Sequence, residues 1–122
     1  MPIRVLLADD HAKIRESLRT LLAGTPGIEV IGEAEDGRKA VQLAHQLLPD
    51  VVVMDVDMPV LDGVEATRWI IRNTRVIAFT GPVEEDTRER LLEAGVSAFL
   101  PKGSGAEEIV SALKAVAETR IQ

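Results

Sequence analysis

The sequence contains no cysteine and very few aromatic side chains. The absence of cysteine excludes disulfides, thiolate metal sites and cysteine nucleophiles. The aromatic residues are Trp69, Phe79 and Phe99, which are too few for a platform that stacks single-stranded nucleic acid. Basic residues are also the minority, 14 against 20 acidic ones in 122 residues, so the net charge is −6. We therefore expect that this chain does not itself bind nucleic acid.

Long apolar runs and glycine-rich loops are missing as well. The segment 1–10 holds only a short apolar run, which Arg4 interrupts and two acids end, so it is neither a signal peptide nor a membrane span. No glycine-rich loop of the P-loop or dinucleotide-binding kind occurs, which leaves nucleotide binding without support. We expect one cytoplasmic domain over residues 1–122, with no contact with a membrane.

The hydrophobic pattern switches repeatedly between the period of a strand and that of a helix. Strands are predicted at 3–8, 28–33, 51–54, 76–79 and 96–100. Helices are predicted around 14–22, 40–48, 63–72, 84–94 and 109–117. Such alternation favours an α/β fold with a parallel sheet and helices on both of its faces. The second strand alternates and suits an edge, whereas the first, third and fourth are apolar enough for the interior.

Residues at the predicted helix ends support these boundaries. Gly24 is well placed to end the first helix, Asp36 to cap the second, and Gly95 to stop the fourth. Ser104 and Glu107 have the spacing of a capping box ahead of the last helix.

Five polar residues follow the predicted strands where these end. Asp9 and Asp10 come after the first strand, Asp55 after the third and Thr80 after the fourth, while Lys102 lies two residues after the fifth. An open parallel sheet forms its ligand crevice at the carboxyl ends of its strands, so these side chains should share one edge.

The chemistry of such a cluster is restricted. Three neighbouring carboxylates repel one another unless a cation neutralises them, and oxygen ligands suit Mg²⁺ better than zinc. A divalent cation, the Lys102 ammonium and the Thr80 hydroxyl around an acceptor carboxylate would form a phosphoryl-transfer site. Asp55 then has two possible roles, as a further metal ligand or as a covalent acceptor.

From about Ile3 to Val116 the chain resembles the receiver domain of a two-component response regulator. The motifs that carry this resemblance are Asp9-Asp10, Asp55-Val-Asp57-Met58-Pro59 with Asp62-Gly63, Thr80-Gly81, and Phe99 three residues before Lys102. The segments around Asp10-His11 and 29–37 further resemble the subfamily with a C-terminal helix-turn-helix output domain, of the NarL/FixJ/LuxR type. The resemblance implies a flavodoxin-like, doubly wound sheet with strand order 2-1-3-4-5 and five helices.

The resemblance also implies a phosphorylation-activated switch. Asp55 would accept a phosphoryl group from the histidine of a sensor kinase. Mg²⁺ would be bound by Asp10, by Asp55 and by the backbone carbonyl of Asp57, with Asp9 acting through water. Lys102 would pair first with Asp55 and then with the phosphoryl group.

The remaining implied roles concern the response to phosphorylation. Thr80 and the Gly81 amide would bind a phosphoryl oxygen, and Phe99 would turn inward as Thr80 moves. Asp57 and Pro82 occupy positions that tune the access of water to the phosphoryl group. The output would be transcription, through a DNA-binding domain outside this chain, so the sequence is either an excised domain or a stand-alone regulator. Self-association through the last helix, giving a homodimer, is possible.

Two features depart from the usual receiver pattern. The stretch from Gly63 to Thr80 is about three residues shorter than expected, so the third helix or its loop should be cut back. Lys102 is preceded by Pro101 and followed by Gly103, where many receivers place a proline after the lysine. Because proline constrains the strand end, the reach of Lys102 toward Asp55 is the point that a structure must test.

Two alternatives stay open. A pseudo-receiver would keep the fold and act as a binding module without being phosphorylated. A phosphatase of the haloacid-dehalogenase type would use Asp55-Val-Asp57 as its nucleophile and acid, but that family places its acidic pair last, whereas here Asp9-Asp10 comes first. We expect a signalling protein that is not an enzyme beyond catalysing its own phosphorylation and dephosphorylation.

Overall fold

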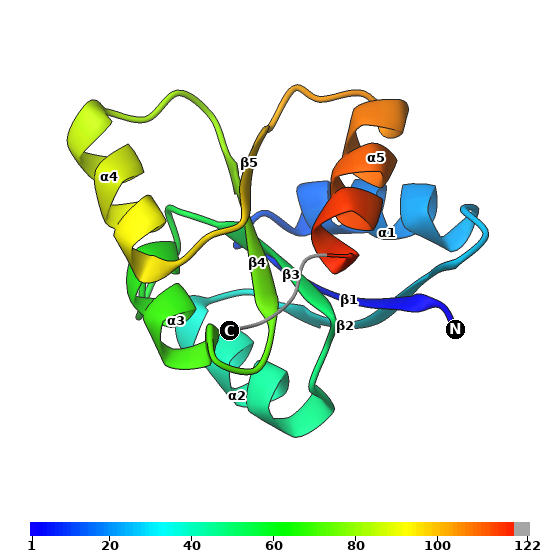
Figure 1. The fold of residues 1–122 in the computed structure, drawn as a ribbon, viewed down its shortest axis with the longest axis horizontal. Coiled ribbons are helices and arrows are strands. Elements are labelled where there is room, and N and C mark those ends of the chain that lie inside the picture. The colour runs from blue at the N-terminus through cyan, green and yellow to red at the C-terminus, as the bar shows by residue number, and fades with distance from the viewer. Residues whose placement is uncertain (119–122) are drawn as a thin grey trace.

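Strands and helices alternate through the computed structural model, which describes residues 1–118 (Figure 1). The strands are β1 (Ile3–Ala8), β2 (Ile28–Ala34), β3 (Val51–Asp55), β4 (Arg75–Thr80) and β5 (Ala98–Pro101). The helices are α1 (Ala12–Ala23), α2 (Gly37–Leu47), α3 (Gly63–Ile70), α4 (Glu85–Ala94) and α5 (Ala106–Ala117). The predicted alternation of period is confirmed, element by element.

The strands form one parallel sheet in the order β2-β1-β3-β4-β5, as the resemblance implied. Every residue of β3 is buried, which explains why its sequence is apolar without alternation. β2 lies at an edge, and most of its residues are partly or fully exposed. The order turns back between β1 and β3, so a crevice forms at the carboxyl ends of those two strands.

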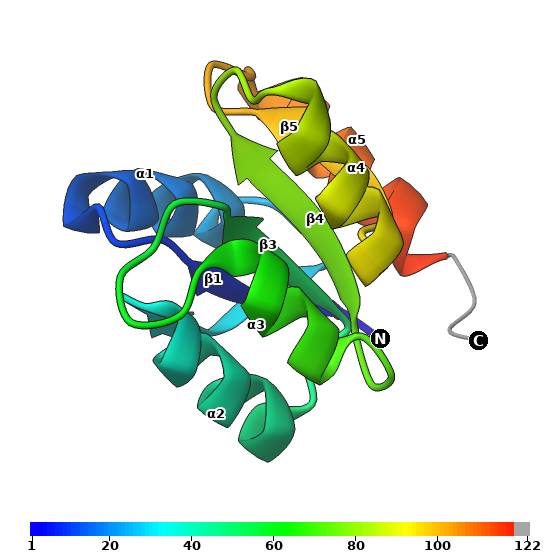
Figure 2. The same cartoon turned by 90° about the vertical axis from the view of Figure 1, so that its left-hand side faces the viewer.

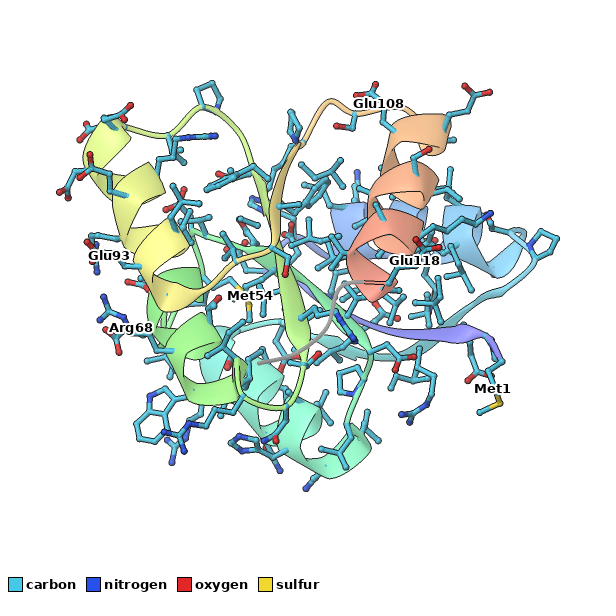
Figure 3. All side chains as sticks on the ribbon, viewed as in Figure 1. Met1, Met54, Arg68, Glu93, Glu108 and Glu118 are labelled. Carbon is cyan, nitrogen blue, oxygen red and sulfur yellow. The ribbon has the colours of Figure 1, made fainter. Side chains whose placement is uncertain are left out.

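Helices cover both faces of the sheet, α1 and α5 on one and α2, α3 and α4 on the other (Figures 1 and 2). Each face buries an apolar cluster. Leu22 and Leu113 belong to the cluster beneath α1 and α5, and Ala40, Ile70 and Leu91 to the opposite one. Figure 3 shows Met54 inside the molecule, whereas Arg68 and Glu93 point outward from α3 and α4. These packed layers hold the strand ends in place.

Two of the helix boundaries are fixed by the residues that the sequence indicated. The Asp36 carboxylate accepts a 2.8 Å hydrogen bond from the Lys39 amide at the start of α2. Gly95 ends α4 in the left-handed conformation, with φ of 106°, which glycine adopts without strain.

Two boundary predictions are wrong by one or two residues. The capping interaction of α5 involves Gly105, whose amide donates to Glu108 Oε1 at 3.3 Å, while the Ser104 hydroxyl donates to the Pro101 carbonyl instead. The fifth strand begins at Ala98 and not at residue 96. The Val96 amide closes the end of α4 by donating to a carbonyl of that helix, so it is not free for the sheet.

The shortened stretch between Gly63 and Thr80 falls on α3, which has 8 residues and ends at Ile70. Ile70 is fully buried, whereas Trp69 is 65% exposed. Packing is therefore preserved along the inner side of α3 although the helix is short. Within residues 1–118, no helix is long and apolar enough to cross a membrane.

Candidate functional site

Lys102 joins two buried carboxylates at the carboxyl edge of the sheet. Its Nζ lies 3.1 Å from Asp55 Oδ1 and 3.4 Å from Asp9 Oδ2. Both aspartates are 1% exposed. The structure thus brings together three of the predicted site residues, which come from the ends of β1, β3 and β5.

Asp55 is the last residue of β3, and its two carboxylate oxygens have different surroundings. Oδ1 faces Lys102 and also accepts a 3.3 Å hydrogen bond from the Asp57 amide. Oδ2 is buried and has no hydrogen-bond partner among the described residues. Burial, together with the charge of Asp9, raises the pKa of Asp55 to about 6, against the opposing effect of Lys102. Such a carboxylate is chemically incomplete unless a further group approaches Oδ2.

The backbone of β3 and its loop fixes the direction of Asp55. Gly63, the first residue of α3, packs directly on the Asp55 carbonyl, and a Cβ at this glycine would lie 2.3 Å from that oxygen. The Gly63 amide donates to the Val56 carbonyl at 2.9 Å. Only glycine allows α3 to start so close to the strand, which accounts for the Asp62-Gly63 pair in the sequence.

Lys102 is placed by the end of the edge strand β5. Pro101 pairs with Thr80 in the β4–β5 register, and the Lys102 amide then donates to the Thr80 carbonyl at 3.0 Å. Proline costs no hydrogen bond at such an edge position, so Pro101 does not keep the lysine from Asp55. Burial lowers the pKa of Lys102, but the Asp55 and Asp9 carboxylates raise it more, so it lies above its ordinary value.

Asp9, Asp10 and His11 form the β1 side of the site. The His11 amide donates to Asp9 Oδ1 at 2.8 Å, and its Nδ1 lies 3.1 Å from the same oxygen and 3.0 Å from Asp10 Oδ1. The sequence did not single out His11 as a member of the site. Its position directly after Asp9-Asp10 was the one available signal, and sequence spacing does not reveal where an imidazole points.

Arg15 supports Asp9 from behind and was also not predicted as part of the site. Its guanidinium donates to the Asp9 carbonyl, and its Nε lies 3.4 Å from Glu33 Oε1 on β2. Arg19 pairs with the other oxygen of Glu33 at 3.1 Å. The end of β1 is thereby connected to α1 and to the edge strand.

The donor set fits a divalent cation. Asp9, Asp10, His11 and Asp55 each offer one ligand atom, and these atoms lie within 4.8 Å of one another. The unpartnered Asp55 Oδ2 belongs to the same cluster. Carboxylate oxygens of this kind suit Mg²⁺, which Asp10 and Asp55 would hold. The Asp57 side chain is exposed, and its amide is the group that contacts Asp55.

Thr80 and Phe99 lie in one hollow beside this cluster. Thr80 ends β4 and is 8% exposed, and the residue before it, Phe79, is the register partner of Asp55. Phe99 is half-buried, and the Arg88 guanidinium of α4 lies over its ring, 4.2 Å from the centroid. Thr80 and Phe99 line the hollow, together with Gly81, Pro82, Val83, Arg88, Leu100, Pro101, Lys102 and Gly103.

The sequence matches a known family model. The model is described as the response regulator receiver domain, and it covers residues 5–114. Among curated relatives, the response regulator GacA of Pseudomonas viridiflava is 41% identical over 93% of this chain and 55% of its own length. The transcriptional regulatory protein LiaR of Bacillus subtilis is 44% identical over 95% of this chain and 56% of its own length. The chain thus spans about half the length of these relatives.

Solved structures agree with the sequence comparisons. The receiver domain of the response regulator NarL from Mycobacterium tuberculosis is 34% identical, with a TM-score of 0.92 and 98% of both chains covered. The response regulator domain of Thermotoga maritima CheB is 33% identical, with a TM-score of 0.91, covering 98% of this chain and 99% of that one.

Proposed function

The chain belongs to the family of response regulator receiver domains, and we propose that it is a switch activated by phosphorylation of Asp55. The observation that carries the proposal is the state of Asp55 Oδ2, a buried carboxylate oxygen with no partner among residues 1–118. Lys102 holds the other oxygen at 3.1 Å, which leaves Oδ2 as the nucleophile. Since the pKa of Asp55 is about 6, most of this carboxylate is ionised near pH 7.

The proposed step transfers a phosphoryl group from the phosphohistidine of a sensor kinase. Asp55 Oδ2 forms the new P–O bond while the P–N bond breaks, and the electron pair of that bond stays on the kinase imidazole. Mg²⁺, held by Asp10 and Asp55 with the Asp57 carbonyl and a water on Asp9, supplies positive charge to the phosphoryl oxygens. Lys102 is near enough to follow the negative charge from the carboxylate to the phosphoryl group.

The change of charge would be read on the neighbouring strand. We propose that Thr80 and the Gly81 amide bind a phosphoryl oxygen and that Phe99 moves as Thr80 does. All three line one hollow, which supports a connected response. A population shift of this kind would control an output domain outside residues 1–122, and transcription is the proposed output because relatives such as LiaR are named transcriptional regulators. Self-association through α5 stays a prediction, which sedimentation would test.

Intact mass spectrometry tests the acceptor. The protein is incubated with acetyl phosphate with and without Mg²⁺, alongside Asp55→Asn and the matched control Asp57→Asn. We expect one phosphoryl adduct that requires Mg²⁺, is lost in Asp55→Asn and is kept in Asp57→Asn. An unmodified parent with both acetyl phosphate and a panel of phosphorylated kinases would contradict the proposal and favour the pseudo-receiver. Repeated turnover of a small phosphate monoester would favour the phosphatase.

Asp57 and Pro82 are proposed to tune the lifetime of the phosphorylated state. Both residues are exposed, Asp57 two residues after the acceptor and Pro82 at the rim of the hollow. Asp57 adds negative charge near the attacking water, and Pro82 offers no side-chain donor. Asp57→Asn and Pro82→Glu should therefore each change the half-life of the phosphorylated protein, measured by the decay of the adduct. Unchanged decay in both variants would sink this proposal.

A further inference from the structure

His11 places an imidazole nitrogen at the mouth of the carboxylate cluster. Its Nδ1 lies 3.0 Å from Asp10 Oδ1 and 3.1 Å from Asp9 Oδ1, so the ring nitrogen faces both carboxylates. The His11 side chain is 62% exposed, whereas that of Asp9 is 2% exposed. His11 therefore stands between solvent and the buried part of the site. No protein partner other than these two carboxylates is needed to explain the direction of its ring.

The donor set changes in kind when His11 is included. Three carboxylates alone form a hard oxygen site suited to Mg²⁺, whereas imidazole nitrogen favours first-row transition metals such as zinc. The four candidate ligand atoms lie within 4.8 Å of one another. Two ligands on opposite sides of one such ion are separated by about 4.0–4.4 Å, so a small side-chain movement lets one ion reach the set.

A second observation points to a cation at this place. Asp55 Oδ2 is buried and unpartnered in the described part of the chain, and Asp9 Oδ2 has only the 3.4 Å ion pair with Lys102. His11 Nδ1 can give up its contact with the carboxylates without leaving the site, because the proton of a neutral imidazole can move to Nε2. One cation would then occupy the position between Nδ1 and the carboxylate oxygens.

We propose that His11 Nδ1 is an additional metal ligand that makes this site prefer a transition-metal ion, Zn²⁺ in the test below, over Mg²⁺. Such an ion would compete with Mg²⁺ and hold His11, Asp10 and Asp55 together. It would thereby reduce phosphorylation of Asp55 when it is abundant. The competition rests on the proposed function, whereas the ligand role of His11 does not.

Calorimetric titration of the full chain tests the preference. Zn²⁺ and Mg²⁺ are titrated separately into the parent, His11→Gln and His45→Gln. His45 is the matched control because it is the other histidine of the sequence, lies on α2 and contacts the Trp69 carbonyl at 3.2 Å. We expect His11→Gln to weaken Zn²⁺ binding about 10-fold or more and Mg²⁺ binding much less, since the carboxylates remain. Equal Zn²⁺ affinity in the parent and in His11→Gln would overturn the proposal.

Pulsed electron paramagnetic resonance identifies the ligand directly. With Mn²⁺ as the probe, coupling to a bound imidazole nitrogen should be present in the parent and in His45→Gln but absent in His11→Gln. Coupling that persists in His11→Gln, or that the parent lacks, would overturn the ligand role. The Mg²⁺-dependent phosphoryl adduct is measured on the same samples. Its absence from the parent would contradict the proposed function while leaving the result for His11 intact.

Discussion

Lys102 reaches Asp55 across a whole strand of the sheet. β4 separates β3, which carries Asp55, from β5, which precedes Lys102, yet Lys102 Nζ and Asp55 Oδ1 are 3.1 Å apart. The lysine crosses over Phe79 of β4, and its Nζ lies 5.9 Å from the centroid of that ring. The long, flexible stem of lysine makes this crossing possible, so a shorter or rigid cation could not replace it.

Lys102→Ala should therefore weaken both the fold and the site. It leaves Asp9 and Asp55 as two buried carboxylates without their shared cation, and breaking such a pair costs about 1–3 kcal/mol when one partner is partly exposed. Urea unfolding at pH 7.5 measures the loss, with Lys114→Ala in α5 as the control. A loss equal to that of the control would show that the crossing contributes nothing to stability.

Asp55 should destabilise the metal-free protein above pH 6. Its pKa is about 6 in the folded protein against an ordinary value of 3.8, so between these values the folded state binds more protons than the unfolded chain. Stability therefore falls as pH rises through this window, by about 1.4 kcal/mol per pH unit at most. Asp55→Asn removes the titration and should be more stable than the parent at pH 7.5, with the difference shrinking toward pH 4.

Unfolding curves of both proteins with chelator, at several pH values, measure this difference. Added Mg²⁺ should reduce it at pH 7.5, because the ion stabilises the ionised carboxylate of the parent. A parent as stable as Asp55→Asn in chelator at pH 7.5 would contradict the assignment of an unsatisfied buried charge to Asp55.

Gly63→Ala should displace the loop that carries the site. The added Cβ would lie 2.3 Å from the Asp55 carbonyl oxygen, so the start of α3 must move. We expect a loss of about 1–3 kcal/mol in unfolding free energy together with weaker Mg²⁺ binding. Gly24→Ala is the control, because its Cβ would meet its nearest neighbour at 3.8 Å. Gly63→Ala with the stability and Mg²⁺ affinity of the parent would refute the close approach.

Arg88 should hold Phe99 in its present position. The guanidinium lies 4.2 Å from the ring centroid, which is the geometry of a cation–π contact worth about 0.5–1 kcal/mol at an exposed site. A double-mutant cycle of Arg88→Ala and Phe99→Leu in urea unfolding should return a coupling energy of that size. Arg88→Lys should retain part of it. Zero coupling would mean that the two side chains are merely neighbours.

The sequence predicts the fold better than it predicts the contacts of the site. Asp9, Asp55 and Thr80 are readable because strand ends are marked by a change of hydrophobic period, and the topology of a parallel sheet does the rest. The boundary errors at Ser104 and Val96 arose where backbone groups at helix ends chose between neighbouring partners.

Side-chain contacts over longer distances were not readable in the same way. The direction of the His11 ring and the position of Arg88 over Phe99 depend on rotamers and on the rotation of α4, which residue spacing does not encode. Pro101 illustrates the opposite error, since a local constraint suggested a difficulty for Lys102 that the edge position of β5 removes.

Chemical trapping tests the central claim most directly. The protein is phosphorylated in Mg²⁺, reduced with borohydride and digested, because an aspartyl phosphate is reduced to homoserine whereas a free carboxylate is not. Peptide sequencing by mass spectrometry should find homoserine at position 55 and unchanged aspartate at positions 9, 10 and 57. Homoserine at one of those other positions, or phosphate on Thr80, would contradict the assignment of Asp55 as the phosphoryl acceptor.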